Sequence, residues 1–330
     1  MTTFKTISPV AIGNGAYVVH KSIESSIPNY HVQSLTPIQA SLPLYKVPLL
    51  EQYDLLHCIP DQGGLLKYGK IPTITTFHNY YTDKTYIATQ SLAKQAYYRT
   101  ILKYYLQLST KKSIKVTTVS KFLWNLVNQE LGLDTELIAN GVDTDKFTIL
   151  PNKMRHANEL KVLFAGNPTS RKGIDTILRL ASSLPNNISI SITSGSRDIN
   201  ITQKRENIRL LGKVSHQDMV KVYNSHDVLL LPTTREGLSL VILEAMACGL
   251  PVITTDIPSN IELVTHGQGG FLYPLESEGK IYDHLITLSN NPNLCSDMGL
   301  QNRQTTLKSF QAKHTNKKYA ELFSETLRTA

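Results

Sequence analysis

The sequence PTTREGLSLVILEAMACGLPVI, residues 232–253, is the part of the chain that says most about its fold. It follows a short apolar run, Val228–Leu231, opens with a polar turn and continues as a helix predicted over Leu238–Cys248. A second apolar run, Pro251–Thr254, comes directly afterwards. Short strands that are apolar throughout and alternate with helices are typical of a parallel sheet covered on both faces. The stretch therefore predicts one repeat of a doubly wound α/β domain.

The same alternation continues on both sides of this stretch. In the second half of the chain, further strands and helices are predicted at Leu160–Ala165, Gly173–Leu184, Ile188–Thr193, Ile208–Leu211, His216–Ser225, Ile257–Val264 and Gly270–Tyr273. The first half is less regular, and it predicts strands at Ala16–His20, Asp54–Cys58, Thr73–Phe77 and Lys115–Val119, with helices at Thr89–Leu108 and Lys121–Leu131. We therefore expect two domains of the doubly wound, Rossmann-like α/β class.

The length of 330 residues suits two domains, each large enough for its own hydrophobic core. The most polar connection is Thr144–Glu159, which contains a proline and is typical of a linker. We place an N-terminal domain at residues 1–146 and a C-terminal domain at residues 147–310. The polar helical tail, residues 311–330, is expected to pack back on the N-terminal domain.

The composition is that of an ordinary globular protein, with 41% hydrophobic and 18% charged residues. It excludes a disordered chain, a collagen-like fibre and a coiled coil. Cys58, Cys248 and Cys295 are scattered and form no CxxC pair, which argues against a disulfide scaffold or a zinc site and fits a reducing cytosol. No apolar run approaches the roughly 18 residues of a spanning helix, so we expect a cytoplasmic protein.

The net charge of +8 comes from one part of the chain. Between Lys84 and Gln129 there is no acidic residue, whereas eight lysines and arginines fall there and equal the whole excess. Such a block points to an anionic partner. Residues 89–112 carry lysine, arginine and tyrosine at helical spacing, which suits an anionic membrane surface. The alternatives are a core helix with a solvated basic face and, without any motif to support it, a nucleic-acid site.

The start of the helix near Leu238 has the features of an anion site. Ligands of open α/β sheets bind at the carboxyl ends of the strands, where such helices begin. The backbone N–H groups of Leu238, Ser239 and Leu240 would face a bound anion, and the helix dipole would add to the attraction. Gly237 would let the anion approach without a side chain in the way.

Two carboxylates flank this helix start. Glu236 lies in the turn, and Glu244 is embedded among apolar helix residues. Burying an unpaired carboxylate is unfavourable, so Glu244 needs hydrogen-bond donors, which the vicinal hydroxyls of a ligand could supply. The simpler alternative is that Glu236 caps the helix and Glu244 lies on its solvent side.

The stretch resembles the donor-site signature of the retaining glycosyltransferases of family 4, also called glycosyl transferases group 1, whose pattern is P-S-x-x-E-G-F-G-L-x-x-L-E-A-M-A-x-G-x-P-V-I. The resemblance covers the C-terminal domain nearly end to end and a few short pieces of the N-terminal domain. It implies the GT-B fold, in which two Rossmann-like domains face each other across a cleft. Similar pieces occur in the expected order: TTFHN at 75–79, NGVD at 140–143, FAGNPTSRKG at 164–173, LGKV at 211–214, and Glu262 with Gly267 and Gly270.

The resemblance also implies roles for single residues. Glu244 would accept hydrogen bonds from the nucleotide ribose, and Glu236 would contact the hydroxyls of the donor sugar. Lys172, beside Arg171, would bind the diphosphate and stabilise the leaving group, unless it is an exposed lysine in a turn. His78 would lie near the reacting sugar, unless it is a structural histidine. The donor-binding set is completed by Val214, by Gly237, Leu238, Ser239 and Leu240, and by Gly13 and Gly15 in a turn beneath the diphosphate.

Two positions depart from the family pattern. Asn167 stands where an arginine is usual, which removes one of the two cations expected at the diphosphate. Arg171 could compensate for that loss. Ser239 replaces the second glycine of E-G-F-G, which restricts the loop but still offers an N–H group and a hydroxyl.

These observations predict a cytoplasmic enzyme that could also lie peripherally on the inner face of the membrane. It would move a sugar from a nucleotide-diphosphate sugar to a lipid-linked or glycan acceptor, with retention of anomeric configuration. No cofactor and no metal are expected, because there is no DxD motif and Lys172, Arg171 and the helix dipole would replace the cation. A GT-B epimerase or phosphorylase and a catalytically silent nucleotide-sugar-binding subunit remain as alternatives.

Overall fold

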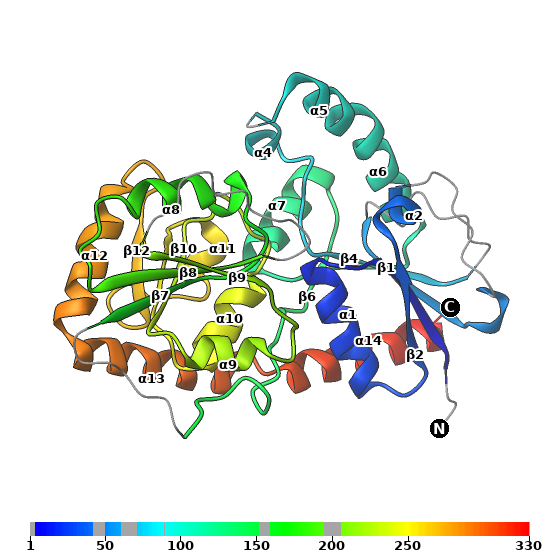
Figure 1. Ribbon diagram of the computed structural model, residues 1–330. Helices are drawn as coiled ribbons and strands as arrows, with labels where there is room; N and C mark the ends of the chain where they lie inside the picture. The colour runs from blue at the N-terminus through cyan, green and yellow to red at the C-terminus, as the bar shows by residue number, and fades with distance from the viewer. Residues whose placement is uncertain are drawn as a thin grey trace. The chain divides into compact units, whose positions relative to one another are not determined.

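The computed structural model describes residues 4–41, 50–60, 71–88, 90–151, 159–194 and 206–329 (Figure 1). The chain forms two compact units, one made of residues 1–140 and 312–330 and the other of residues 141–311. The crossover predicted at 146/147 differs from the division of these units, which falls at 140/141 and again at 311/312. Part of the expected linker, residues 152–158, lies outside the described residues.

The first unit is built on a parallel sheet whose strands follow the order β2-β1-β3-β4-β5-β6. The central strands β3 and β4 are buried along their whole length, as expected for a sheet with covered faces. The bounds are β1 Thr6–Ala11, β2 Tyr30–Leu35, β3 Leu55–Cys58, β4 Thr73–Phe77, β5 Lys115–Thr118 and β6 Glu136–Leu137.

One strand predicted for this unit is a helix. The sequence pattern predicts a strand at Ala16–His20, but these residues lie in helix α1, Gly15–Ser26, and the strand before them is β1. Asn14 caps the helix, because its side chain accepts a hydrogen bond of 2.8 Å from the backbone N–H of Tyr17. The buried residues of α1 recur at helical spacing, so this short apolar run is one face of a helix.

The first unit has helices before, between and after its strands. They are α1, α2 Pro37–Ser41, η1 Leu50–Gln52, α4 Lys84–Ala88, α5 Leu92–Tyr97, η2 Tyr98–Leu102, α6 Lys103–Lys112, α7 Lys121–Leu131 and the C-terminal α14 Ala312–Thr329. Helix α14 packs within this unit. Thr315 Oγ1 donates a hydrogen bond of 2.8 Å to the carbonyl of Ala139, and Phe323 stacks on Tyr30 with 5.6 Å between ring centroids.

The segments α5, η2 and α6 follow one another without a break over residues 92–112. The middle segment, η2, is a wider π-helix. The first ten residues of this stretch are mostly exposed, including Leu92 at 83% and Ile101 at 51%. Burial begins at Leu102 and Leu106, which anchor the second half of the helix. The alternative of a core helix is therefore wrong for the first half. Thr89, where the predicted helix begins, lies outside the described residues.

The second unit repeats the design with a parallel sheet in the order β12-β11-β10-β7-β8-β9. The strands are β7 Leu160–Phe164, β8 Ile188–Ser194, β9 Ile208–Lys213, β10 Val228–Leu231, β11 Val252–Thr255 and β12 Gly270–Tyr273. The helices are η3 Ser170–Lys172, α8 Ile174–Leu180, α9 Met219–Asn224, α10 Leu240–Ala247, α11 Pro258–Ile261, α12 Gly279–Asn290 and α13 Pro292–Ser309. The α/β class with two parallel sheets is confirmed. Within the described residues, no helix combines the length and the apolar character needed to cross a membrane.

Candidate functional site

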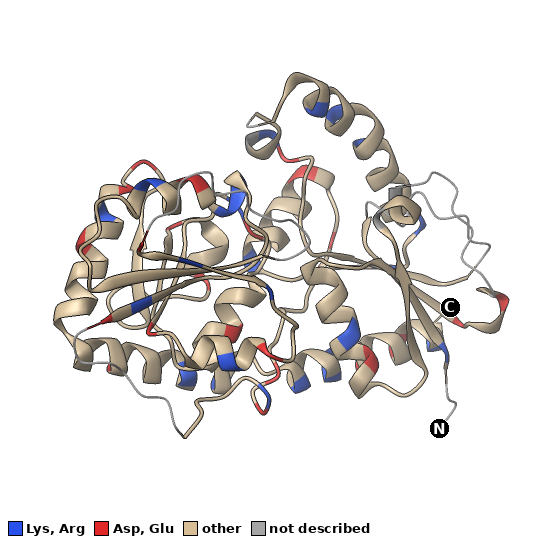
Figure 2. Ribbon diagram, in the orientation of Figure 1, with Lys and Arg blue, Asp and Glu red and all other residues tan. Residues whose placement is uncertain are grey.

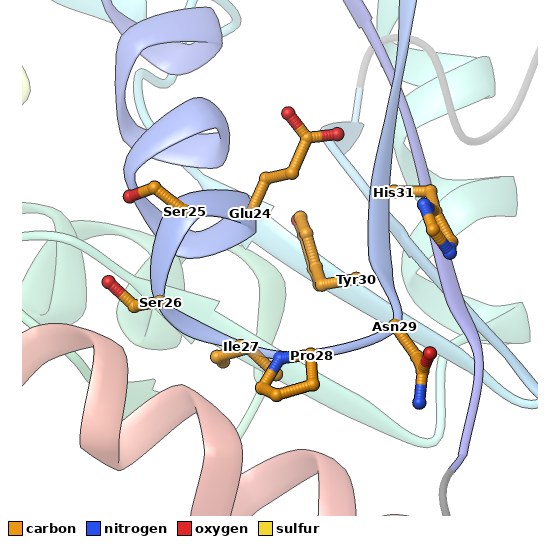
Figure 3. A pocket seen from close by; sticks show the side chains of 8 residues that line it. All are labelled: Glu24, Ser25, Ser26, Ile27, Pro28, Asn29, Tyr30 and His31. Atoms are coloured by element: carbon orange, nitrogen blue, oxygen red, sulfur yellow. The ribbon is translucent and has the colours of Figure 1, made fainter.

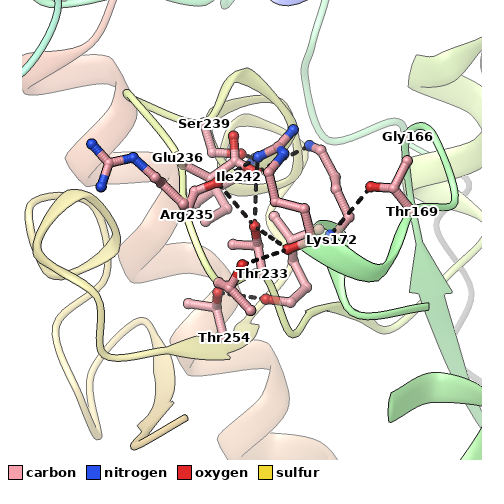
Figure 4. A network of polar contacts seen from close by, with 12 residues as sticks. Gly166, Thr169, Lys172, Thr233, Arg235, Glu236, Ser239, Ile242 and Thr254 are labelled. Atoms are coloured by element: carbon pink, nitrogen blue, oxygen red, sulfur yellow. Dashed lines mark hydrogen bonds and ion pairs between the residues drawn. The ribbon is translucent and has the colours of Figure 1, made fainter. Parts of the chain in front are cut away.

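The turn between β10 and α10 carries a buried carboxylate with three polar partners (Figure 4). Glu236 is 8% exposed, and its Oε1 lies 3.2 Å from Arg171 Nη1 and 3.3 Å from Lys172 Nζ. The hydroxyl of Thr233 donates a third contact to the same oxygen at 3.0 Å. Two cations therefore share one buried anion at the carboxyl end of a central strand.

The charge state of Glu236 follows from these contacts. Burial alone would raise the pKa of the Glu236 carboxyl, but the charges of Lys172 and Arg171 outweigh it and hold the pKa below its ordinary value. Glu236 is therefore ionised at neutral pH. The cluster carries two positive charges against one negative charge, so it has a net positive charge to offer an anion.

Two tight turns hold the cations in place. Thr169 caps η3 by accepting from the backbone N–H of Lys172 at 3.3 Å, and the N–H of Thr234 donates to the carbonyl of Arg171 at 2.8 Å. Gly173 adopts φ +82°, and a Cβ there would lie 2.2 Å from the carbonyl oxygen of Pro232. The turn after β7 and the turn after β10 thus meet at a position that only glycine fits.

Helix α10 begins beside this cluster. Ser239 caps it, because Ser239 Oγ accepts from the N–H of Ile242 at 3.4 Å. Leu240 opens the helix, Leu238 is 5% exposed, and Gly237 lies directly after Glu236. The N-terminal end of this helix and the cations of η3 lie around the same turn, so the structure brings these predicted residues together.

Glu244 has different partners from Glu236. It is 6% exposed, so the alternative that it lies on the solvent side of α10 is wrong. His216 Nε2 contacts Glu244 Oε1 at 2.9 Å, and the hydroxyl of Tyr223 donates to Oε2 at 2.8 Å. Burial, together with the neighbouring charge of Glu244, raises the pKa of Tyr223, which keeps its hydroxyl protonated as a donor.

Sequence reasoning missed these two partners of Glu244. His216 comes two residues after Val214, in the segment that follows β9, and its side chain is 44% exposed. Lys146 Nζ lies 3.1 Å from the other ring nitrogen of His216. In the sequence, only the polar character of these two partners could have suggested that they bind a carboxylate. The spacing between residues 216 and 244 does not predict that they are in contact.

The first unit holds the remaining predicted residues. Gly13, at φ +83°, lies in the turn between β1 and α1, and Gly15 begins α1. His78 directly follows β4 and is half-buried, with its Nε2 3.1 Å from Nε2 of His20. Burial lowers the pKa of His78 to about 3, so the ring is neutral at physiological pH. Among the described residues, no group of three or more His, Cys, Asp or Glu is arranged to bind a metal ion.

A hollow of about 390 Å³ lies at the turn between α1 and β2, lined by residues 24–31 (Figure 3). Glu24 is its one carboxylate, and Oε1 of Glu24 already accepts a hydrogen bond of 2.6 Å from the backbone N–H of Val32. None of the residues predicted for the site lines this hollow. We therefore assign it no role in the chemistry.

Comparison with known families accounts for nearly the whole chain. The family model described as "Glycosyl transferases group 1" matches residues 146–305. The model described as "Glycosyltransferase Family 4" matches residues 13–146. The first match includes Lys172, Glu236 and Glu244, and the second includes His78.

Two curated relatives are also described as glycosyltransferases. An uncharacterised glycosyltransferase of Methanocaldococcus jannaschii is 25% identical over 271 residues, which cover 78% of this chain and 72% of the relative. An uncharacterised glycosyltransferase of Haemophilus influenzae is 30% identical over 216 residues, or 62% of this chain and 59% of the relative. The chain thus spans between about three fifths and three quarters of the length of these two relatives.

Solved structures show the same fold. Sucrose-phosphate synthase from Thermosynechococcus elongatus superimposes with a TM-score of 0.79 at 17% identity, covering 99% of this chain and 100% of the other. The Anabaena protein HepE, solved in complex with UDP and glucose, gives a TM-score of 0.76 at 18% identity and covers 97% of this chain and 99% of its own. At these identities the likeness establishes the GT-B architecture.

Proposed function

This chain belongs to the glycosyltransferases of family 4, group 1, and from that premise we propose that it transfers a sugar from a nucleotide-diphosphate sugar to an acceptor. The transfer retains the anomeric configuration. The observation that carries the proposal is the buried cluster of Glu236, Lys172 and Arg171 beside the start of α10. A net positive charge next to the N-terminal end of a helix suits a departing diphosphate.

In the proposed reaction, the bond between the anomeric carbon and the β-phosphate oxygen breaks, and the electron pair stays on the diphosphate. Lys172, Arg171 and the N–H groups of α10 stabilise the negative charge that develops there. The acceptor hydroxyl enters on the same face, its oxygen bonds to the anomeric carbon, and its proton passes to the departing phosphate oxygen. Glu236 holds the two cations and accepts hydrogen bonds from the hydroxyls of the sugar.

The same residues supply the charge that a divalent cation supplies in other transferases. We therefore propose a reaction without a cofactor or a metal. Turnover should be unchanged when EDTA is added. Loss of turnover with EDTA, restored by Mg²⁺ or Mn²⁺, would contradict this part of the proposal.

The donor can be identified by binding. A thermal-shift panel of nucleotide diphosphates and their sugars should show one nucleotide that raises the melting temperature, because a ligand of the folded state stabilises it. Uridine diphosphate is the first candidate, since HepE was solved with UDP. Interconversion of the donor sugar without release of diphosphate would indicate an epimerase, and binding without turnover on any acceptor would indicate a silent subunit.

We further propose that the acceptor is lipid-linked and that the enzyme lies on the inner face of the membrane. Figure 2 shows the basic residues on α5 and α6, a stretch that contains no acidic residue. Leu92 at 83%, Tyr104 at 61% and Ile101 at 51% exposure add apolar surface along the same helix. Exposed apolar side chains interleaved with lysine and arginine are typical of helices that bind anionic lipid.

Vesicle sedimentation tests this second part. The protein should sediment with vesicles containing anionic lipid and remain free of neutral vesicles, since each Lys or Arg near such a surface contributes about 1 kcal/mol. Replacing Lys94, Arg99, Lys103, Lys111 and Lys112 by Gln should abolish sedimentation and leave donor binding intact.

The matched control replaces five exposed lysines elsewhere by Gln: Lys280, Lys308, Lys313, Lys317 and Lys318. It changes the net charge equally and should keep vesicle binding. Equal loss in both variants would show that total charge, and not the helix, drives binding. Absence of binding at low salt would contradict the membrane proposal and favour a soluble acceptor.

A further inference from the structure

The core of the first unit contains three neighbouring histidines that the donor site in the second unit does not use. His20 comes from α1, His57 from β3, and His78 follows β4. His20 stacks on His57 with 4.4 Å between ring centroids, and His78 lies 5.2 Å from His20. His20 and His57 are completely buried. Three imidazoles in one apolar core need a defined set of hydrogen-bond partners.

The partners form a continuous chain of hydrogen bonds. His78 Nε2 lies 3.1 Å from His20 Nε2. On its other side, His20 Nδ1 contacts Ser8 Oγ and, at 3.0 Å, the hydroxyl of Tyr30. The Tyr30 hydroxyl is closer to Nδ1 of His57, at 2.7 Å. A half-buried ring is thus joined to the middle of the sheet through His20.

The chain of hydrogen bonds ends deep inside the first unit. His57 Nε2 lies 2.7 Å from Thr76 Oγ1, which in turn lies 2.6 Å from Thr117 Oγ1. The hydroxyl of Tyr319, on α14, is 3.4 Å from Thr76 Oγ1. All of these groups are buried, so water does not offer them alternative partners. The buried end of the chain is therefore fixed by packing.

Each ring in the chain is neutral. Burial lowers the pKa of His20 well below its ordinary value, and it lowers the pKa of His57 and of His78 to about 3. A neutral imidazole has one N–H group and one acceptor nitrogen. The position of the proton on one ring therefore determines its position on the next.

The distances favour one arrangement of the protons. The Tyr30 hydroxyl lies 2.7 Å from His57 Nδ1 and 3.0 Å from His20 Nδ1, which favours donation to His57. In that arrangement Ser8 donates to Nδ1 of His20, and the proton of His20 is on Nε2 and points to Nε2 of His78. With its Nε2 acting as acceptor, His78 must carry its own proton on Nδ1. Among the described residues, no group pairs with that Nδ1.

We propose that His20 is a positioning residue that holds His78 in the Nδ1–H tautomer, so that His78 presents a hydrogen-bond donor, and not a base, to a sugar oxygen. The kinetic consequence rests on the proposed function, because it requires that His78 touches substrate. The tautomer itself does not. The structural part can therefore be tested without a donor or an acceptor.

The first test is long-range ¹H–¹⁵N correlation NMR of the histidine rings in the full-length ¹⁵N-labelled protein, with His78 assigned by His78→Ala. His78 should be a single Nδ1–H tautomer at pH 7. In His20→Phe, which fills the space without any polar group, it should become a mixture. His20→Gln places an amide near the former Nε2 and should keep the single tautomer. His31→Phe, at an exposed ring on β2, is the matched control and should change nothing.

An Nε2–H tautomer or a mixture in the unchanged protein would overturn the proposal, as would an unchanged His78 in His20→Phe. If His20→Phe does not fold, the tautomer in the unchanged protein and in His20→Gln still decides the question.

The second test is kinetic. His20→Phe should lower kcat about tenfold, the loss of one hydrogen bond, with the donor KM little changed. In a His78→Ala background it should have no further effect, because His20 acts through His78. If His78→Ala leaves kcat unchanged while the tautomers behave as expected, the catalytic role of His78 fails and the positioning by His20 stands. If His78→Ala lowers kcat but neither His20 variant alters kcat or the tautomer, the proposal for His20 fails and the role of His78 stands.

Discussion

Among single residues, Glu236 is the most constrained, because its Oε1 contacts two cations and a hydroxyl while it is nearly inaccessible to solvent. A neutral residue there would leave Lys172 and Arg171 without their counter-charge. The cluster would then be more positive but less ordered. Its geometry, and not its charge alone, is what we expect the transfer to depend on.

Glu236→Gln should therefore lower turnover by about 100-fold, the scale for one misplaced electrostatic group. Because the pKa of Glu236 is depressed in the folded state, its stabilising contribution is complete above the ordinary value of 4.5 and is lost as pH falls through the folded-state pKa. The stability difference between the unchanged protein and Glu236→Gln should thus be constant from pH 6 to 8 and shrink below about pH 4.5. Urea unfolding at several pH values measures it. A difference that grows toward low pH would contradict the ion pairing.

Lys172→Ala should reduce turnover far more than stability. The Lys172 side chain contacts Glu236 and lies along Gly166, and Arg171 keeps its own contact with Glu236 when Lys172 is removed. Its loss should leave the melting temperature within a few degrees while removing charge stabilisation of the leaving group. Because Asn167 replaces the usual arginine, Lys172→Ala with Arg171→Ala should be worse than either change alone. If the double variant equals Lys172→Ala, Arg171 does not compensate.

Glu244→Gln tests the ribose role. Its carboxylate is held by His216 and Tyr223, and both contacts are compatible with further acceptor bonds because a carboxylate offers about four lone-pair sites. Removing the charge should weaken donor binding by about 1.5–3 kcal/mol. Isothermal titration with the nucleotide diphosphate found in the thermal-shift panel measures this. Equal affinity in both proteins would rule out the ribose contact.

At the scale of elements, the second unit was the more predictable because its strands are continuous apolar runs bounded by turn residues. β10 and α10 lie where the stretch at residues 228–248 places them. The error in the first unit came from the same rule, since the run that includes Val18 and Val19 is apolar enough for a strand. In the structure Asn14 caps a helix. The sequence alone did not indicate this cap, because an asparagine between two glycines is also typical of a turn.

One turn carries Lys172 and Arg171, and another carries Glu236. The two turns pack against each other at Gly173. Gly173→Ala should reduce stability by at least about 2 kcal/mol, because the residue is left-handed and its Cβ would overlap Pro232. It should also reduce turnover, since Lys172 and Arg171 would shift. Gly279→Ala is the matched control, because nothing lies within 4 Å of the added Cβ. If the two variants unfold at the same urea concentration, the turns are not coupled through this contact.

At the scale of the whole molecule, the sequence predicted the fold class and two α/β units because their repeating pattern is local. It pointed to Lys172, Arg171 and Glu236 mainly through resemblance and did not predict their contacts with one another, since residues 171 and 236 come from different turns. It missed the partners of Glu244 and the histidine chain of the first unit. Those contacts join residues such as Ser8, Tyr30 and Tyr319 that are far apart in sequence, and no spacing rule connects them.

The proposed activity is transfer of a sugar from a nucleotide-diphosphate donor. The most direct measurement is release of nucleotide diphosphate from a panel of nucleotide sugars, with and without membrane lipid extract as acceptor, for the unchanged protein and for Lys172→Ala. We expect release from one donor, increased by acceptor and nearly abolished in Lys172→Ala, whose melting temperature should stay within a few degrees. Binding of a nucleotide diphosphate without release from any donor, or release that is equal in the two proteins, would contradict it.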